Sequence, residues 1–285
     1  MKFRTQILKK SYDIDLANVI KNALKEDIPR KDITSEMLIP ETSISEAIIT
    51  AKENGILCGT DILRQCFKLM DNRMNIRFLK KDGNRIRKGD VILKLKGKTK
   101  AILEAERTAL NFLQHLSGIA TYTNKMVLIA KKYNVTVLDT RKTIPGLRHL
   151  AKYAVQTGGG KNHRLHLSDE ILIKENHIVA NGGIEKTLQK IRKCYKQDFE
   201  VEVENLNELK SALDHKVKYI LLDNFSLSDM KKAASINNGR AKLEASGGVN
   251  LKNISKIAST GINFISVGAV THSAPALDFS LILVR

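Results

Sequence analysis

The chain has 285 residues, a length that suits one large domain or two ordinary ones. Hydrophobic residues make up 42% of it and charged residues 27%, values typical of globular proteins, which excludes a disordered or fibrous chain. No apolar run approaches the ~18–20 residues of a membrane span, and the N-terminal stretch lacks an apolar segment long enough for a secretory signal. The three cysteines form no C-x-x-C pair, and their odd number argues against a disulfide framework. We therefore expect a cytoplasmic protein with no membrane partner.

The chain is strongly basic. It has 48 Lys and Arg against 30 Asp and Glu, a net charge of +18. A basic protein attracts phosphates, nucleic acid or acidic small molecules. A nucleic-acid binder would also need aromatic residues for base stacking, but only 5% of the residues are aromatic and Trp is absent. A basic nucleic-acid-binding protein is therefore a distant alternative, and no nucleic-acid partner is expected.

The first part of the chain mixes helical and strand patterns. These patterns predict, in order, a helix, a strand with a turn, a small antiparallel element and a long helix, over residues 15–27, 47–62, 81–98 and 100–133. The glycine at Ser117-Gly118 predicts an interruption of the long helix. We expect an N-terminal α/β domain of sandwich-like form over residues 1–115, joined by the C-terminal segment 273–285.

From about residue 134 onward, short β-branched runs alternate with helical patterns. Six runs predict strands, over residues 135–139, 171–174, 200–203, 219–223, 241–245 and 264–267. The last four begin 19, 22 and 23 residues apart, which is the length of a βα unit with short loops. Such alternation predicts a parallel sheet, here over residues 116–272. Several strands end on polar or glycine residues, and catalytic residues collect at that end in βα barrels, which favours a barrel.

The chemistry is concentrated between residues 139 and 174. This stretch holds seven basic residues, three acidic residues, three histidines and three consecutive glycines at 158–160. Arginine forks match carboxylates and phosphates, and lysines supply point charges. A ligand with several negative charges would suit four of these cations: Arg141, Lys142, Arg164 and Lys174.

Acidic residues follow on later strands. In FEVEVEN, alternation places Glu200, Glu202 and Glu204 on one face and the valines on the other. Asp223 ends the next strand. Carboxylates opposite a cationic pocket can hold sugar hydroxyls, hold Mg²⁺ or stabilise a developing cation, and the pattern leaves all three open. The turns EASGGV and SVGAV offer backbone N–H groups that can hold a phosphate.

Taken together, these motifs resemble the quinolinate phosphoribosyltransferase family over essentially the whole chain. They occur in one order, as ERTALNFLQHLSGIAT, DTRKTIPGLR, KYAVQTGGGKNHR, LIKENH, VEVENL, LLDNF, EASGGV and SVGAVTHS. The resemblance implies an N-terminal α/β domain beside an incomplete, open TIM-like barrel. It also implies a reaction of de novo NAD biosynthesis, in which quinolinate and phosphoribosyl pyrophosphate give nicotinate mononucleotide, pyrophosphate and CO₂, with Mg²⁺.

The resemblance also implies roles for single residues. Catalytic roles fall on Lys142, Lys174, Glu202 and Asp223. Substrate-binding roles fall on Arg107, Thr140, Arg141, Lys142, His163, Arg164, Lys174, Glu202, Asp223, Ser246, Gly247, Gly248, Val267, Gly268, Ala269 and His272. Mg²⁺ would lie near Glu202 and Asp223. The family works as a homodimer or a multiple of dimers, such as a hexamer of dimers, with Arg107 donated to the partner's site.

Some positions depart from the family pattern. RKDIT stands where GDIT is common, LIKENH stands where LIKDNH is common, and His166 stands where Gly is common. The bulkier His166 is expected to narrow the loop after the histidine–arginine pair. A paralogue of the same fold, such as the molybdenum-transport-associated homologue, would act on another substrate. Arg107 and the Lys of LIKENH favour the quinolinate enzyme over this alternative.

Overall fold

The computed structural model describes residues 12–284. The sequence predicts no secretory signal in the N-terminal stretch, and most of that stretch lies outside the described residues. The described chain divides into two compact units. An N-terminal unit contains residues 12–124, 144–159 and 273–284, and a barrel unit contains residues 125–143 and 160–272. The first division falls at 124/125 rather than at the expected 115/116, and residues 144–159 also belong to the N-terminal unit. The C-terminal segment joins the N-terminal unit, as expected.

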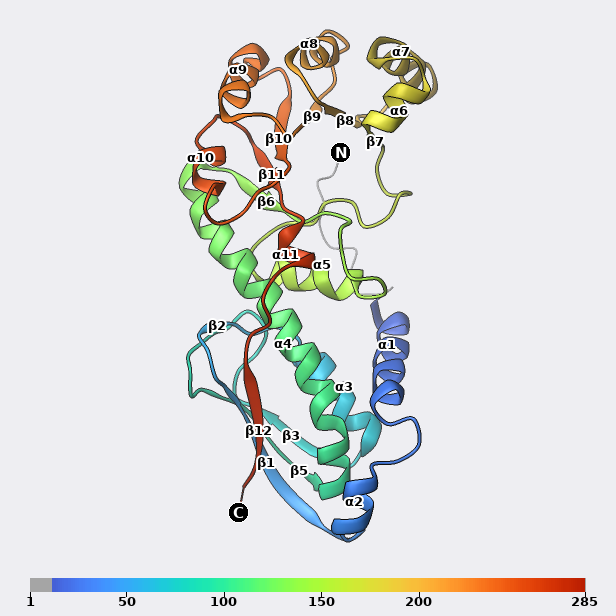
Figure 1. The fold of residues 1–285 in the computed structure, drawn as a ribbon, viewed down its shortest axis with the longest axis vertical. Coiled ribbons are helices and arrows are strands. Elements are labelled where there is room, and N and C mark those ends of the chain that lie inside the picture. The colour runs from blue at the N-terminus through green and yellow to red at the C-terminus, as the bar shows by residue number, and fades with distance from the viewer. Residues whose placement is uncertain (1–11, 285) are drawn as a thin grey trace. The chain divides into compact units, whose positions relative to one another are not determined.

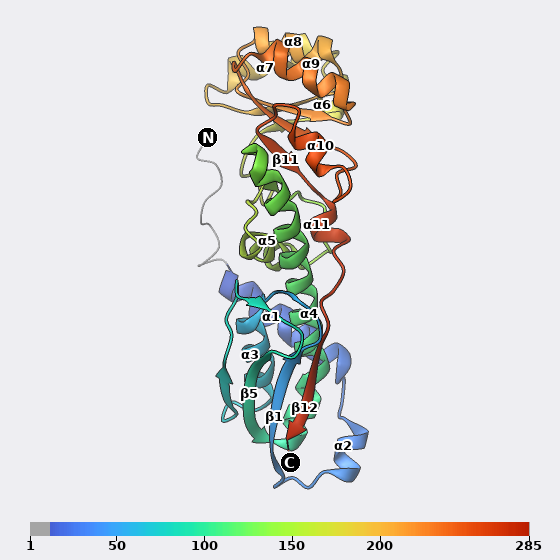
Figure 2. The same cartoon turned by 90° about the vertical axis from the view of Figure 1, so that its left-hand side faces the viewer.

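The N-terminal unit combines helices with a small antiparallel sheet. Its elements are α1 (Tyr12–Asp27), α2 (Ile33–Leu38), β1 (Ile44–Ala51), β2 (Gly55–Ile56), α3 (Thr60–Met70), β3 (Asn75–Phe78), β4 (Arg85–Ile86), β5 (Val91–Lys98), most of α4 (Thr99–Ala130), α5 (Arg148–Thr157) and β12 (Phe279–Val284). The four-stranded sheet has the order β12-β1-β5-β3, and β2 pairs separately with β4. Figure 2 shows β12 beside β1, where the two strands pair antiparallel.

Helix α3 is an element that the sequence patterns did not predict. Gly59 precedes it in a left-handed conformation, with φ of 108°. The Asp82 carboxylate accepts hydrogen bonds from the N–H groups of Gly59 and Thr60, both at 3.0 Å. A residue more than twenty positions away thus satisfies the first N–H groups of the helix, a task usually done by a local cap. The start signal is therefore invisible in the local sequence.

The expected interruption of the long helix is wrong, because α4 is continuous from Thr99 to Ala130. Ser117 donates to the Cys58 carbonyl oxygen and accepts from the Cys58 N–H. At Gly118 an added Cβ would lie 2.2 Å from the Pro275 carbonyl oxygen. The glycine therefore permits close packing of the C-terminal segment against an unbroken helix.

The barrel unit alternates strands and helices. Its elements are the end of α4, a 3₁₀ turn (Lys131–Tyr133), β6 (Thr136–Leu138), β7 (Leu172–Ile173), α6 (Glu175–Ala180), α7 (Ile184–Cys194), β8 (Glu200–Val203), α8 (Leu206–Asp214), β9 (Tyr219–Asp223), α9 (Leu227–Asn237), β10 (Lys242–Ser246), α10 (Ile254–Ala258), β11 (Phe264–Ser266) and α11 (Ala269–His272). All six predicted strands are confirmed, each within one residue at either end.

The six strands form one parallel sheet that is an open ring. The order is β6-β11-β10-β9-β8-β7, so the last strand pairs with the first, as in a barrel. The opening lies between β6 and β7, where Lys161 forms a parallel bridge to Leu138. The segment that follows α5 thus runs along the free edge of β6.

The two faces of this sheet differ in chemistry. Val201 and Val203 of β8 are fully buried. The helices α7, α8 and α9 lie along the outer side of the strands (Figure 1). Glu200 and Glu202 alternate with them and face the inside of the ring, which confirms the predicted alternation. Within the described residues, no helix is long and apolar enough to cross a membrane.

Candidate functional site

Strand register brings polar side chains together inside the ring. Glu202 lies level with Leu221, and Leu221 lies level with Glu244 on the next strand. Two residues further toward the carboxyl ends, Asp223 lies level with Ser246. Because the strands are parallel, these carboxyl ends meet at one edge of the sheet, where the loops converge.

The loop after β6 carries the first predicted cations. The Thr140 hydroxyl accepts a hydrogen bond from the Lys142 N–H at 3.0 Å. Thr271, in α11, donates to the Lys142 carbonyl oxygen at 2.6 Å, which ties this loop to the loop after β11. The Arg141 Nε is buried and has no hydrogen-bond acceptor within the described part of the chain. A buried guanidinium donor of this kind is a ready partner for an anion.

His163 and Arg164 lie on the segment beside β6. The His163 N–H donates to Asp139 Oδ1 at 2.8 Å, and Asn162 donates to the other carboxylate oxygen of Asp139. The Arg164 guanidinium donates through Nη1 to the Glu170 carbonyl oxygen at 3.0 Å. Asp139 is completely buried, so it holds this segment from inside the unit.

The loop after Arg164 folds around Asp169. Its carboxylate accepts from the N–H groups of Leu165 and His166, at 2.7 and 2.9 Å, and lies 2.9 Å from His166 Nδ1. Burial opposes ionisation, but the hydrogen bonds from His166 and Leu165 lower the pKa of Asp169. The unusual His166 is thus turned toward Asp169 at the outside of the loop, with half of its side chain exposed.

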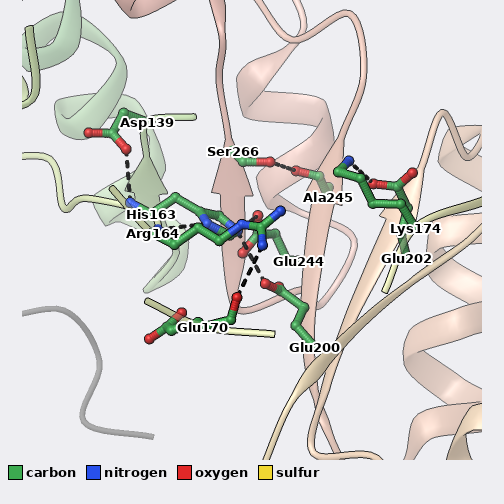
Figure 3. Close-up of polar contacts among 10 residues, drawn as sticks. All are labelled: Asp139, His163, Arg164, Glu170, Lys174, Glu200, Glu202, Glu244, Ala245 and Ser266. Carbon is green, nitrogen blue, oxygen red and sulfur yellow. Dashed lines mark hydrogen bonds and ion pairs between the residues drawn. The ribbon is translucent and has the colours of Figure 1, made fainter. Parts of the chain in front are cut away.

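Lys174 and Glu202 form an ion pair. Lys174 follows β7, and its Nζ lies 2.6 Å from Glu202 Oε2 (Figure 3). The Lys174 side chain is 44% exposed and the Glu202 side chain 11% exposed. The lysine therefore leaves donors free for a ligand while it fixes the carboxylate.

Further carboxylates lie near Glu204, two residues after Glu202. Partial loss of hydration and the negative charges of its neighbours raise the pKa of Glu204. These neighbours are Glu175, Glu208, Asp223 and Glu202. Carboxylate oxygens in excess are the donors that a hard divalent cation prefers, so these residues fit Mg²⁺ chemically.

Glycines bring the last two loops close to their neighbours. At Gly247, with φ of 101°, an added Cβ would lie 2.0 Å from Asn224 Oδ1. At Gly268 an added Cβ would lie 3.1 Å from both His272 Nε2 and Lys142 Cδ. The loop after β10 therefore has no room for a side chain at position 247, and the loop after β11 has little room at position 268.

The other predicted residues of these loops have different environments. Gly248 is exposed and takes a left-handed φ of 59°. Val267 is 1% exposed, and its N–H donates to the Leu138 carbonyl oxygen. Its side chain therefore packs in the interior, and its N–H hydrogen-bonds to β6. Ala269 begins α11, and the exposed His272 ends it.

Arg107 belongs to the N-terminal unit, unlike the other predicted site residues. It is exposed on α4 and lines a cavity of about 400 Å³ together with Asp27 and His115. Gly158, the first of the three consecutive glycines, also lies in that unit. At Gly158 an added Cβ would lie 2.4 Å from the Ala120 carbonyl oxygen, so this glycine permits helix packing.

Three buried acids surround His163, namely Asp139, Glu200 and Glu244. Sequence reasoning linked none of them to His163, and it missed Glu244 altogether. Glu244 stands mid-strand between the buried residues Leu243 and Ala245. A carboxylate in the middle of an apolar parallel strand is the signal that could have identified it, because an isolated buried charge is costly.

Both halves of the chain match models of a known protein family. Two family models match the chain, namely the N-terminal domain of quinolinate phosphoribosyl transferase over residues 32–117 and its C-terminal domain over residues 119–282. The second match alone covers more than half of the chain. This chain belongs to the quinolinate phosphoribosyltransferase family.

Relatives within the quinolinate phosphoribosyltransferase family cover nearly the whole chain. A probable nicotinate-nucleotide pyrophosphorylase (carboxylating) of Bacillus subtilis is 40% identical over 270 residues, which are 94% of this chain and 93% of that protein. The quinolinate phosphoribosyltransferase (decarboxylating) 1 of Nicotiana glauca is 41% identical over 94% of this chain and 82% of its own length. The structure of the nicotinate-nucleotide pyrophosphorylase from Francisella tularensis superimposes with a TM-score of 0.92 at 43% identity, covering 98% and 99% of the two chains.

Proposed function

We propose that this protein is a quinolinate phosphoribosyltransferase of de novo NAD biosynthesis. It joins quinolinate to phosphoribosyl pyrophosphate and releases nicotinate mononucleotide, pyrophosphate and CO₂. The observation that carries the proposal is the ring of strand ends, where cations and carboxylates meet in a chain that belongs to this family in both domains. A cationic side for a dicarboxylate and an acidic side for a ribose are what this reaction requires.

The cationic side binds quinolinate. Arg141 and Arg164 take its two carboxylates, since planar guanidinium groups match carboxylates in two-point hydrogen bonding. The buried Arg141 Nε supports this assignment because an anion would supply the acceptor it lacks within the described residues. Lys142 and Lys174 add charge, and the His163 segment holds Arg164 in place.

The acidic side binds the ribose and its metal. Glu202 and Asp223 lie at neighbouring strand ends, and the crowding that raises the pKa of Glu204 favours a bound cation. When bound with phosphoribosyl pyrophosphate, Mg²⁺ neutralises charge on the departing pyrophosphate. The 5′-phosphate lies against the backbone of Ser246, Gly247, Gly248, Gly268 and Ala269, with His272 beside it.

The reaction begins at the ribose C1. The bond from C1 to the pyrophosphate oxygen breaks, and positive charge develops that Glu202 and Asp223 stabilise. The quinolinate ring nitrogen then forms the new bond to C1, and the arginines make this step effectively unimolecular by holding the ring. The quaternary nitrogen next stabilises the carbanion left when the adjacent carboxylate departs as CO₂, and that carbon takes up a proton.

A second subunit completes the site in this proposal. Arg107 lies in the N-terminal unit, exposed beside a cavity, as a residue donated to another copy of the chain must be. We propose a homodimer, alone or as a multiple of dimers. The proposed location is the cytoplasm, in keeping with three cysteines that are all free thiols.

The decisive experiment is release of CO₂ from carboxyl-labelled quinolinate in the presence of phosphoribosyl pyrophosphate and Mg²⁺. Release is expected from the wild type and from Arg73→Ala, whose parent side chain is 81% exposed, and a loss is expected for Arg107→Ala. No release by folded wild-type protein would overturn the proposal. Screening other aromatic carboxylates would then test the paralogue.

A further inference from the structure

A buried group of three side chains lies deeper in the ring than the predicted ligands. Glu200 and Glu244 are each 2% exposed, and His163 is 7% exposed. Glu200 stands two residues before Glu202 on β8, on the same inner face. Their ligand-type atoms all lie within 4.8 Å of one another. Neither glutamate belongs to the set of residues assigned to substrate.

The hydrogen bonds of the His163 ring define its protonated nitrogen. The Arg164 N–H donates to His163 Nδ1 at 2.8 Å, so Nδ1 offers its lone pair and the ring proton lies on Nε2. Nε2 lies 3.1 Å from Glu200 Oε2 and 3.6 Å from Glu244 Oε1. The ring therefore links the Arg164 backbone on one side to two buried carboxylates on the other (Figure 3).

Arg164 is thus held at two points. Its backbone N–H is bound by the His163 ring, and its guanidinium is bound by the Glu170 carbonyl oxygen at 3.0 Å. Without the hydrogen bond from the Arg164 N–H to the His163 ring, the Arg164 backbone could rotate and turn the guanidinium in another direction. A displaced guanidinium would bind a carboxylate more weakly, because its paired hydrogen bonds depend on distance and angle.

Stability is a poor explanation for the two glutamates. Replacing buried charged groups by apolar side chains of similar volume is often neutral or stabilising. Carboxylates in the interior of a ring therefore point to a task that apolar residues cannot perform. Accepting a hydrogen bond from His163 Nε2–H is such a task for Glu200, whose Oε2 lies 3.1 Å away, and it fixes the rotation of the ring. Glu244 Oε1, at 3.6 Å, adds a negative charge beside the same nitrogen.

We propose that Glu200 and Glu244 are positioning residues that act on Arg164 through the His163 ring. The inference rests on the proposed function, in which Arg164 holds a carboxylate of quinolinate. Glu200, at the shorter distance, has the larger effect. Neither glutamate touches the substrate.

The test compares quinolinate binding, measured by titration calorimetry, with steady-state kcat and KM for both substrates. The variants are Glu200→Met, Glu200→Gln, Arg164→Ala and the double variant Glu200→Met/Arg164→Ala. Glu185→Ala serves as the control, since Glu185 is exposed on α7. Glu200→Met should weaken quinolinate binding at least about tenfold and raise its KM equally, with kcat and the KM for phosphoribosyl pyrophosphate within about twofold.

Two further results separate positioning from general damage to the fold. Glu200→Gln should restore most of the affinity, because its amide oxygen still accepts from Nε2–H. Glu200→Met should add nothing once Arg164 is already alanine, because the two changes remove the same interaction. A full additional loss in the double variant, or normal quinolinate affinity in folded Glu200→Met, would overturn the inference.

The outcomes remain distinct from failure of the proposed function itself. That failure would appear as wild-type protein that neither binds quinolinate nor releases CO₂. Should Glu200→Met not fold, Glu244→Met on β10 provides the same comparison from another strand. Its quinolinate affinity must then fall in the wild-type background and stay unchanged in the Arg164→Ala background.

Discussion

At the scale of single residues, the two sides of the site have separate tasks. Arg141 and Arg164 are proposed to hold an anion, and the Arg164 guanidinium also donates a hydrogen bond to the Glu170 carbonyl oxygen. Asp223 ends β9 at the edge where the ribose is proposed to lie. Binding energy and turnover should therefore respond to different substitutions.

Arg141→Ala and Arg164→Ala should each raise the KM for quinolinate by about 10- to 100-fold, the cost of one charge-assisted hydrogen-bonded pair. Asp223→Ala should instead lower kcat, because the developing positive charge loses a stabilising carboxylate. Steady-state kinetics with each substrate varied separately provide the measurement. An unchanged quinolinate KM in both arginine variants would contradict the assignment.

The two buried thiols should react more slowly than the exposed one. Burial raises the pKa of the Cys66 thiol to about 12 and raises the pKa of Cys58 well above its usual value, whereas Cys194 is exposed. Iodoacetamide at pH 8 should therefore modify Cys194 alone in the native protein and all three cysteines in denaturant. Mass spectrometry of the alkylated protein checks this expectation.

The raised pKa of Cys66 makes the free energy of unfolding depend on pH. The raised pKa means that the folded state retains the Cys66 proton, while the unfolded thiol ionises near its ordinary value of about 8.5. This contribution to stability is complete below about pH 8.5 and is lost as the pH rises toward about 12. Urea unfolding at pH 7 and pH 10 should show the decline, and Cys66→Ala should reduce it.

At the scale of elements, helix α4 depends on a contact with a distant part of the chain. Leu277 donates its N–H to the Gln114 carbonyl oxygen, and Gly118 lies against Pro275. The C-terminal segment thus passes along the middle of α4 before it joins the sheet as β12. A small residue at position 118 is what allows this approach.

Gly118→Ala should destabilise the protein by about 1–3 kcal/mol, although alanine is the better helix former, because the added methyl overlaps backbone atoms. Equilibrium urea unfolding measures the change. Asn111→Ala, on an exposed position of the same helix, is the matched control and should be neutral or slightly stabilising. Equal stability of Gly118→Ala and wild type would show that the C-terminal segment can move aside.

At the scale of the whole molecule, the proposed site needs two chains. Arg107 is carried by the N-terminal unit and Asp223 by the barrel unit. In a dimer that shares sites, a chain lacking Arg107 spoils its partner's site, whereas a chain lacking Asp223 spoils its own. In a mixed dimer both changes therefore fall in one site and leave the other intact.

Mixing Arg107→Ala with Asp223→Ala should therefore restore activity that neither variant has alone. Random exchange makes about half of the dimers mixed, and each mixed dimer has one intact site of two, so about a quarter of wild-type activity is expected. Co-refolding of equal amounts followed by the CO₂-release assay measures this. If Arg107 served its own chain, the mixture would stay inactive.

The sequence by itself determined the parallel sheet and most of its chemistry. Local β-branched runs set the six strands, and period-two alternation placed Glu200 and Glu202 on one face of their strand, because both depend on neighbouring residues alone. That this face looks into the ring was decided by the tertiary structure. Cations and glycines at the strand ends likewise were visible in order along the chain. These features depend on residues close together in the sequence, so the sequence pattern alone can predict them.

Only the tertiary structure decided the features that join distant segments. Asp82 starts α3 from over twenty residues away, Pro275 makes Gly118 a packing site in an unbroken helix, and Glu200 and Glu244 meet on His163 from separate strands. Each contact satisfies a polar group or permits a close approach only after the chain has folded. Local propensity cannot predict them, because the partner that determines each outcome lies elsewhere in the sequence.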